Sequence, residues 1–148
     1  MYEFKDWATA DIVLIVEEDS LEKLFKTSGI ALENYMVEGI KKKNSTKINI
    51  SARDLRELIF LWLNELIYIK DSKNLFFNDF DIEIKKNDEY KLTAVGYGEK
   101  FDQKRHDSKH DVKSCTYHKL EVRKINRKNK NYKNKNYKSW RAQVVLDI

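Results

Sequence analysis

Residues 76–97 read FFNDFDIEIKKNDEYKLTAVGY, and apolar side chains recur in them at every second position from Phe80 onward. Ile82 and Ile84 continue this alternation, which resumes after the polar segment Lys86–Glu89. A period of two places successive side chains on opposite faces of a strand. Adjacent Asn and Asp residues favour a turn. The stretch therefore predicts a β-hairpin.

A helical period precedes the hairpin. Residues 55–69 carry apolar side chains three and four positions apart, which is the spacing of one face of an α-helix. Asp54 stands just before them, where a carboxylate can accept hydrogen bonds from the free N–H groups of the first turn. An earlier helix is predicted from Asp19, whose spacing to Glu22 has the form of a capping box, to about Gly39.

Further segments on both sides of these elements are predicted to be strands. Asp11–Val16 is a short β-branched run and Lys47–Ser51 alternates, as do Ser114–Arg123 and Trp140–Ile148. The resulting order is β-α-β-α-β-β-β-β. This order predicts an α+β fold, with two helices packed on one side of a mixed or antiparallel sheet.

The length and composition are those of one globular domain. The chain has 148 residues, of which 41% are hydrophobic and 36% are charged. Its apolar stretches are too short or too charged to cross a bilayer, and Met1–Trp7 lacks a signal-like apolar run. We therefore expect a cytoplasmic protein without membrane association. The single cysteine, Cys115, cannot form an internal disulfide or a cysteine-based zinc site.

The net charge of +5 is concentrated near the end of the sequence. Residues 123–141 contain nine Lys or Arg and no acidic residue, whereas the rest carries 20 basic and 24 acidic residues. The Asn- and Lys-rich segment of about residues 124–138 lacks apolar periodicity, so we expect a solvated loop. An arm that contacts phosphates is the alternative.

Two aspartates occupy unusual places in the predicted strands. Asp11 opens the most apolar strand and Asp147 lies at the end of the last one, where an unpaired buried carboxylate would be costly. The α-carboxylate of Ile148 adjoins Asp147. If Asp11 meets this end, three carboxyl groups form an oxygen site suited to Ca²⁺ or Mg²⁺. The alternative is that both aspartates are ordinary surface acids, because periodicity does not show whether they meet.

Several segments, in chain order, resemble the archease family. They are WATADI (7–12), SLEKLF (20–25), WLNELIY (62–68), GE (98–99) followed by His106, VKSCTYH (112–118) and DI (147–148). The family has His-Thr-Ala-Asp in the first segment and Val-Lys-Ala-x-Thr-Tyr-His in the fifth. The main departure is Ala8, which stands where the family usually has histidine.

The resemblance implies a non-enzymatic protein cofactor of RtcB, the GTP-dependent RNA ligase of tRNA splicing and RNA repair. Such a cofactor helps the ligase to acquire its guanylyl group and to turn over repeatedly, and it meets RNA through the ligase. The residues that the resemblance implies are the metal ligands Asp11, Asp147 and Ile148, the essential Lys113, and in addition Glu99, His106 and His118.

Two other functions remain open from the residues. A stand-alone RNA-binding protein would use the basic loop, with Tyr132 and Tyr137 as stacking groups. A metal-dependent hydrolase would use Asp11, Asp147 and His106. Neither explains the ordered set of segments.

Overall fold

The structure is a computed structural model, and it describes residues 1–128 and 136–148. The helices are α1 Leu21–Met36 and α2 Leu55–Lys73. The strands are β1 Tyr2–Ala8, β2 Asp11–Glu18, β3 Val37–Glu38, β4 Asn44–Ala52, β5 Leu75–Lys86, β6 Tyr90–Lys100, β7 Asp107–Ser108, β8 Ser114–Lys128 and β9 Asn136–Asp147.

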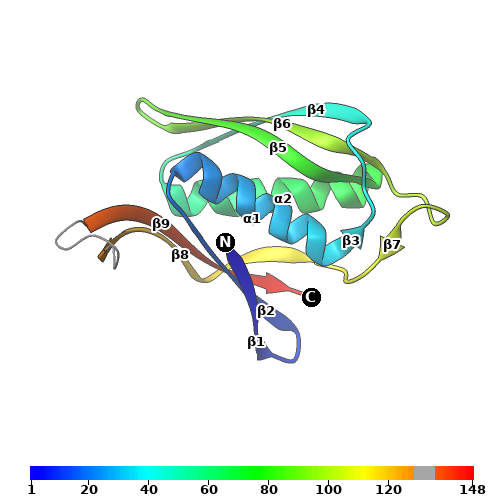
Figure 1. The fold of residues 1–148 in the computed structure, drawn as a ribbon, viewed down its shortest axis with the longest axis horizontal. Coiled ribbons are helices and arrows are strands. Elements are labelled where there is room, and N and C mark those ends of the chain that lie inside the picture. Colours follow the sequence, from blue (N-terminus) through cyan, green and yellow to red (C-terminus); the bar gives the residue numbers. More distant parts are fainter. Residues whose placement is uncertain (129–135) are drawn as a thin grey trace.

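The two helices lie between two antiparallel sheets (Figure 1). One sheet has the strand order β1-β2-β9-β8 and the other has the order β4-β6-β5. The predicted α+β class is confirmed, but the helices are covered on both sides rather than on one. The physical reason is that both sheets present an apolar face: Leu14 and Val144 are fully buried on the first, and Phe80 is fully buried on the second.

Both helices begin at a side-chain cap. Asp54 accepts a hydrogen bond from the N–H of Glu57 at 2.9 Å, which confirms the predicted start of α2. The cap of α1 is Ser20, which accepts from the N–H of Lys23, so the predicted capping box at Asp19 is wrong. Helix α1 ends at Met36 rather than near Gly39, because Val37 adopts an extended backbone and pairs in β3 with β7.

The predicted hairpin is confirmed as β5 and β6, whose register runs from Lys86 opposite Tyr90 to Leu75 opposite Lys100. Strand β1 was not predicted. Its residues are exposed except for the half-buried Phe4, so no apolar alternation marks it. Phe4 contacts Tyr35 of α1 with ring centroids 4.8 Å apart, and this contact ties the edge strand to the core.

The basic segment forms more strand than predicted. Strands β8 and β9 remain paired from Ile125 opposite Ser139 to Lys128 opposite Asn136, so the expected loop over residues 124–138 is wrong at both ends. Backbone hydrogen bonds form this ladder whatever the side chains are, and the two-stranded ribbon extends beyond the helices (Figure 1). Residues 129–135, which include Tyr132, lie outside the described residues.

The core is centred on Trp62 of α2. Its indole is fully buried, donates from Nε1 to the carbonyl of Phe25 at 3.0 Å, and meets the ring of Phe80 edge-on at 5.1 Å. Gly29 permits this packing, because a Cβ there would lie 3.0 Å from Phe80 and 3.1 Å from Trp62. In the described part of the chain, no helix has the length and apolar character needed to cross a membrane.

Candidate functional site

Asp11 and Asp147 lie directly opposite each other in the pairing of β2 with β9. The N–H of Ile148 donates to the carbonyl of Ala10 at 2.9 Å, so these two residues form a hydrogen-bonded pair. Because the two kinds of pair alternate along an antiparallel ladder, Asp11 and Asp147 form a non-hydrogen-bonded pair. Such pairs have Cα atoms about 4.5 Å apart and the closest cross-strand side chains. The structure therefore brings together the two aspartates that the sequence singled out.

The pair belongs to the outer face of the four-stranded sheet. Ile12 and Leu14 are buried toward the helices, and because side chains alternate between the two faces of a strand, Asp11 belongs to the other face. Both aspartates are half-buried. Ser114 of β8 lies opposite Asp147, and Ala8 of β1 lies opposite Asp11. One row across all four strands thus holds the two carboxylates at the end of the sheet.

Lys113 joins the same end of the sheet through its backbone. Its N–H donates to the carbonyl of Asp147 at 2.7 Å, immediately before β8 begins. Its side chain is exposed, and its positive charge contributes to lowering the pKa of Asp111, behind the larger effect of the hydrogen bond from Lys70. The structure therefore places Lys113 at the same end of the sheet as Asp11, Asp147 and Ile148.

The two carboxylates of the aspartate pair carry like charges. Two like charges in directly opposite positions destabilise a sheet. Among the described residues, neither Asp11 nor Asp147 has a hydrogen-bonding or ion-pairing partner for its carboxylate. In that same part of the chain, no group of three His, Cys, Asp or Glu side chains could hold a metal. A hard cation would therefore use two carboxylates, a main-chain oxygen and water, and this donor set suits Ca²⁺ or Mg²⁺.

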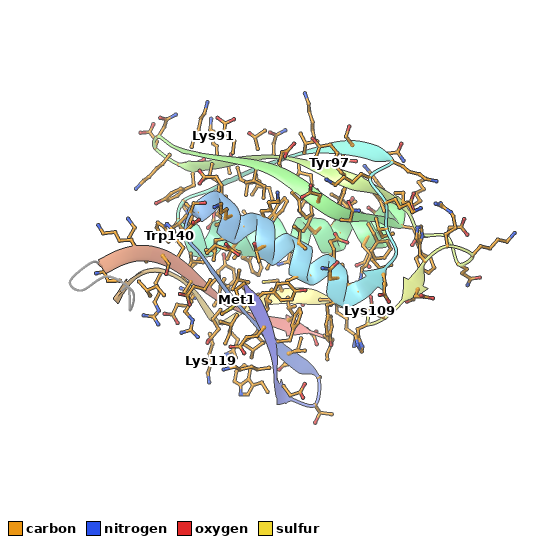
Figure 2. The ribbon with its side chains drawn as sticks, viewed as in Figure 1. Met1, Lys91, Tyr97, Lys109, Lys119 and Trp140 are labelled. Atoms are coloured by element: carbon orange, nitrogen blue, oxygen red, sulfur yellow. The ribbon has the colours of Figure 1, made fainter. Side chains whose placement is uncertain are left out.

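An aromatic stack covers the outer face beside the aspartates. Trp7 lies parallel to His118, with ring centroids 4.8 Å apart and planes 3° apart. The ammonium of Lys119 lies 4.4 Å from the Trp7 ring centroid, on the side of the sheet away from the helices (Figure 2). Because β1 and β8 are opposite edges of the sheet, this contact spans the outer face. Val145 of β9 is 2% exposed although its neighbours Val144 and Leu146 occupy the inner face, so the outer face of β9 is also covered at this position.

A bulge in β8 carries His118 and Lys119 to this position. The register of β8 with β9 shifts between Thr116 and Glu121, and Lys119 has a left-handed backbone with φ of 51°. The sequence analysis did not predict this bulge, and it missed Trp7 as a contact. Ala8 offers no polar side chain opposite Asp11.

Glu99 and His106 form a second, separate cluster. His106 Nε2 is hydrogen-bonded to Glu99, and its Nδ1 accepts from the N–H of Asp102 at 2.8 Å, so the proton of the ring lies on Nε2. Arg105 also donates to Glu99 at 3.1 Å. Burial acts to raise the pKa of Glu99, but the hydrogen bonds from His106 and Arg105 outweigh it and lower this pKa.

This second cluster ties the end of β6 to the segment that leads to β7. Both Glu99 and His106 are buried, at 2% and 4% exposure. Within the described residues, no hydrogen bond or ion pair connects them with Asp11 or Asp147. The structure therefore does not assemble the three residues that the hydrolase hypothesis requires.

Sequence reasoning also missed two polar residues of α2 that contact the start of β8. Lys70 and Asn64 lie under the segment around Lys113, and Lys70 is only 8% exposed. A signal was available for Lys70, because it follows Leu63 and Leu66 at helical spacing and so interrupts the apolar face.

Comparison with known proteins extends over the whole chain. The profile of the Archease protein family (MTH1598/TM1083) matches residues 2–148. Protein archease of Pyrococcus abyssi is 36% identical over 143 residues, covering 95% of this chain and 94% of its own length. Protein archease of Methanosarcina barkeri is 31% identical over 151 residues, covering 99% and 95%.

Solved structures agree with these relatives. The solution structure of Methanobacterium thermoautotrophicum protein 1598 superposes with a TM-score of 0.78 at 26% identity, covering 99% of this chain and 98% of that one. The crystal structure of a Thermotoga maritima archease, described as a possible chaperone, shares the fold, with a TM-score of 0.54 at 19% identity over 95% and 93% of the two chains. The ordered sequence segments, the matching fold and the full-length similarity together show that this chain belongs to the archease family.

Proposed function

We propose that this protein activates the GTP-dependent RNA ligase RtcB in tRNA splicing and RNA repair. The activator promotes guanylylation of the ligase and its repeated turnover, while the ligase performs the covalent chemistry and binds the RNA. The observation that carries the proposal is the pairing of Asp11 with Asp147 beside Lys113, at one end of an archease-family fold.

The aspartate pair is the proposed site for a divalent cation, Ca²⁺ or Mg²⁺. Asp11 and Asp147 supply carboxylate oxygens and Ile148 supplies a main-chain oxygen. A divalent cation held there would balance the charges of the two opposed carboxylates and would offer its remaining coordination positions to oxygen ligands such as phosphate. The stacked Trp7 and His118 lie on the sheet beside the aspartates.

Lys113 is the proposed contact with the ligase or its nucleotide. Its side chain is exposed, while its backbone N–H is bonded to the carbonyl of Asp147, so the residue is anchored beside the aspartate pair. A lysine at this position can bind a phosphate or an acidic side chain of a partner as a point charge. The fold thereby presents a small charged tip, and its own residues orient that tip.

The experiment measures transfer of labelled guanylate from GTP to purified RtcB, with and without this protein. The parent chain is expected to accelerate guanylylation at substoichiometric concentration. Asp11→Asn and Lys113→Ala are expected to lose most of the stimulation. Asp19→Asn is the matched control, because Asp19 is exposed and pairs only with Lys23 among the described residues. Equal guanylylation with and without the parent protein would disprove the proposal.

A further inference from the structure

The peptide group between Val112 and Lys113 makes hydrogen bonds with both of its polar atoms, the carbonyl oxygen and the N–H. The carbonyl of Val112 accepts from Nζ of Lys70 at 2.9 Å, and the N–H of Lys113 donates to the carbonyl of Asp147 at 2.7 Å. A peptide group is planar, so two bonds at its opposite edges fix its orientation. This single peptide therefore connects helix α2 with Asp147.

Lys70 is well suited to hold that peptide. Its ammonium has three donors and three acceptors nearby: Asp111 Oδ1 at 2.7 Å, Val112 O at 2.9 Å and Asp71 Oδ1 at 3.1 Å. A buried ammonium is costly unless it is fully paired. Since Lys70 is 8% exposed, its charge would be buried without a partner if its side chain moved away from residues 111–112.

The three acceptors of Lys70 do not depend on it equally. The carboxylates of Asp111 and Asp71 belong to side chains that are 74% and 60% exposed, and water solvates such groups well. Val112 is fully buried, so its carbonyl has little access to water if Lys70 is removed. The bond to Val112 is therefore the one that most constrains the backbone.

Asn64 holds the other side of Lys113. Its Nδ2 donates to the carbonyl of Cys115 at 3.0 Å, and its Oδ1 accepts from the N–H of Cys115 at 2.9 Å. The side-chain amide thus satisfies both polar backbone atoms of one residue, as a neighbouring strand would. Lys70 and Asn64, together called the α2 clamp, attach the chain just before and just after Lys113.

We infer that the α2 clamp positions Lys113 relative to Asp147, so that Lys70 and Asn64 are positioning residues for activation of the ligase. This inference rests on the proposed function. The clamp contacts the backbone on both sides of Lys113 rather than its side chain, and it acts by holding the entry of β8 in place. Without the clamp, the entry of β8 would be held to the sheet by its pairing with β9 and by the bond from Lys113 to Asp147, with no hydrogen bond from α2 to Val112 or Cys115.

The test combines amide hydrogen exchange with the guanylylation assay. Lys70→Met keeps the length of the side chain but removes its donors. We expect the Lys113 amide to exchange at least tenfold faster, with exchange in α1 and β5 unchanged, and maximal stimulation at saturating protein to fall at least fivefold. Lys70→Arg, which retains donors, is expected to restore both. Asp71→Asn is the matched control, because it removes the charge of an exposed ion-pair partner and leaves the bond to Val112 intact.

Asn64→Ala tests the second point of the clamp with Lys70 in place. Faster exchange at Lys113 and Cys115 together with lower stimulation is expected, and unchanged values for a folded Asn64→Ala protein would overturn the inference. The same holds for a folded Lys70→Met protein, and if that variant does not fold, Asn64→Ala decides. If the parent chain does not stimulate the ligase, the proposed function fails, whereas the exchange measurements still test whether the clamp holds Lys113.

Discussion

Trp7 and His118 stack face to face, 4.8 Å between ring centroids, although they belong to strands on opposite edges of one sheet. The bulge of β8 makes this contact possible, and Lys119 in the bulge has the left-handed backbone conformation that the detour requires. Non-glycine residues in that conformation are strained and persist where the surrounding contacts stabilise them. The stack with Trp7 is such a contact, and it covers the face of the sheet beside the paired aspartates.

Replacing Trp7 is expected to destabilise the protein although the residue is 40% exposed. Trp7→Ala removes the stack with His118 and the contact with Lys119, each worth about 0.5–1 kcal/mol, so the free energy of unfolding should fall by about 1–2 kcal/mol. Urea titration measures the change. Tyr68→Ala is the control, because Tyr68 is 62% exposed and has no ring contact among the described residues. A double-mutant cycle with His118→Ala that shows no coupling would contradict the role of the stack.

Removing one of the opposed carboxylates is expected to stabilise the protein when no divalent cation is present. Asp11→Asn should raise the free energy of unfolding by about 0.2–1 kcal/mol in chelator, because like charges in directly opposite positions repel. Added Ca²⁺ should raise the melting temperature of the parent and not that of Asp11→Asn. Differential scanning calorimetry with and without Ca²⁺ measures both effects. A parent melting temperature that does not respond to Ca²⁺ or Mg²⁺ would argue against the cation site.

Glu33 of α1 is expected to make stability depend on pH. The residue is 1% exposed, and within the described residues no side chain donates a hydrogen bond to its carboxyl oxygens. Burial raises the pKa of Glu33 well above its ordinary value, and a backbone hydrogen bond from Phe77 and the Lys70 charge oppose this with smaller effects. A raised folded pKa contributes stability that is fully present below the unfolded pKa, about 4.3, and that is lost as pH rises toward the folded pKa.

The variant Glu33→Gln should remove this dependence. The stability of the parent relative to Glu33→Gln should fall by up to about 1.4 kcal/mol per pH unit above pH 4.3. Urea unfolding of both proteins from pH 4 to pH 8 measures the difference. Glu22→Gln, which changes a carboxylate in the first turn of the same helix, is the control. Parallel pH profiles of the parent and Glu33→Gln would show that Glu33 is not the titrating group.

The cluster around His106 is expected to be structural. His106→Ala leaves the N–H of Asp102 without its acceptor and removes a hydrogen bond from the buried Glu99, so a loss of about 2–4 kcal/mol follows. Thermal unfolding measures this loss, and Lys104→Ala in the same segment is the control. A melting temperature within a degree of the parent would show that Arg105 alone satisfies Glu99.

The sequence alone determined the local elements. The hairpin of β5 and β6 and the stripe of α2 follow from apolar periodicity, which reports the period of a single element and which of its faces is buried. Periodicity carries no signal for an exposed edge strand such as β1, whose side chains face water. It also does not register a ladder formed by backbone hydrogen bonds alone, as in the extension of β8 and β9.

The sequence likewise indicated the chemistry of the candidate site, because carboxylates at the ends of apolar strands are unusual. Only the tertiary structure decided that Asp11 and Asp147 are partners, since their pairing depends on the order in which β2 and β9 lie in the sheet. It also decided that Lys70 and Asn64 hold the segment around Lys113, and that Trp7 reaches His118. The physical reason is that these contacts join residues far apart in the chain, and only the strand order of the four-stranded sheet and the packing of α2 against it bring them within hydrogen-bonding and stacking distance.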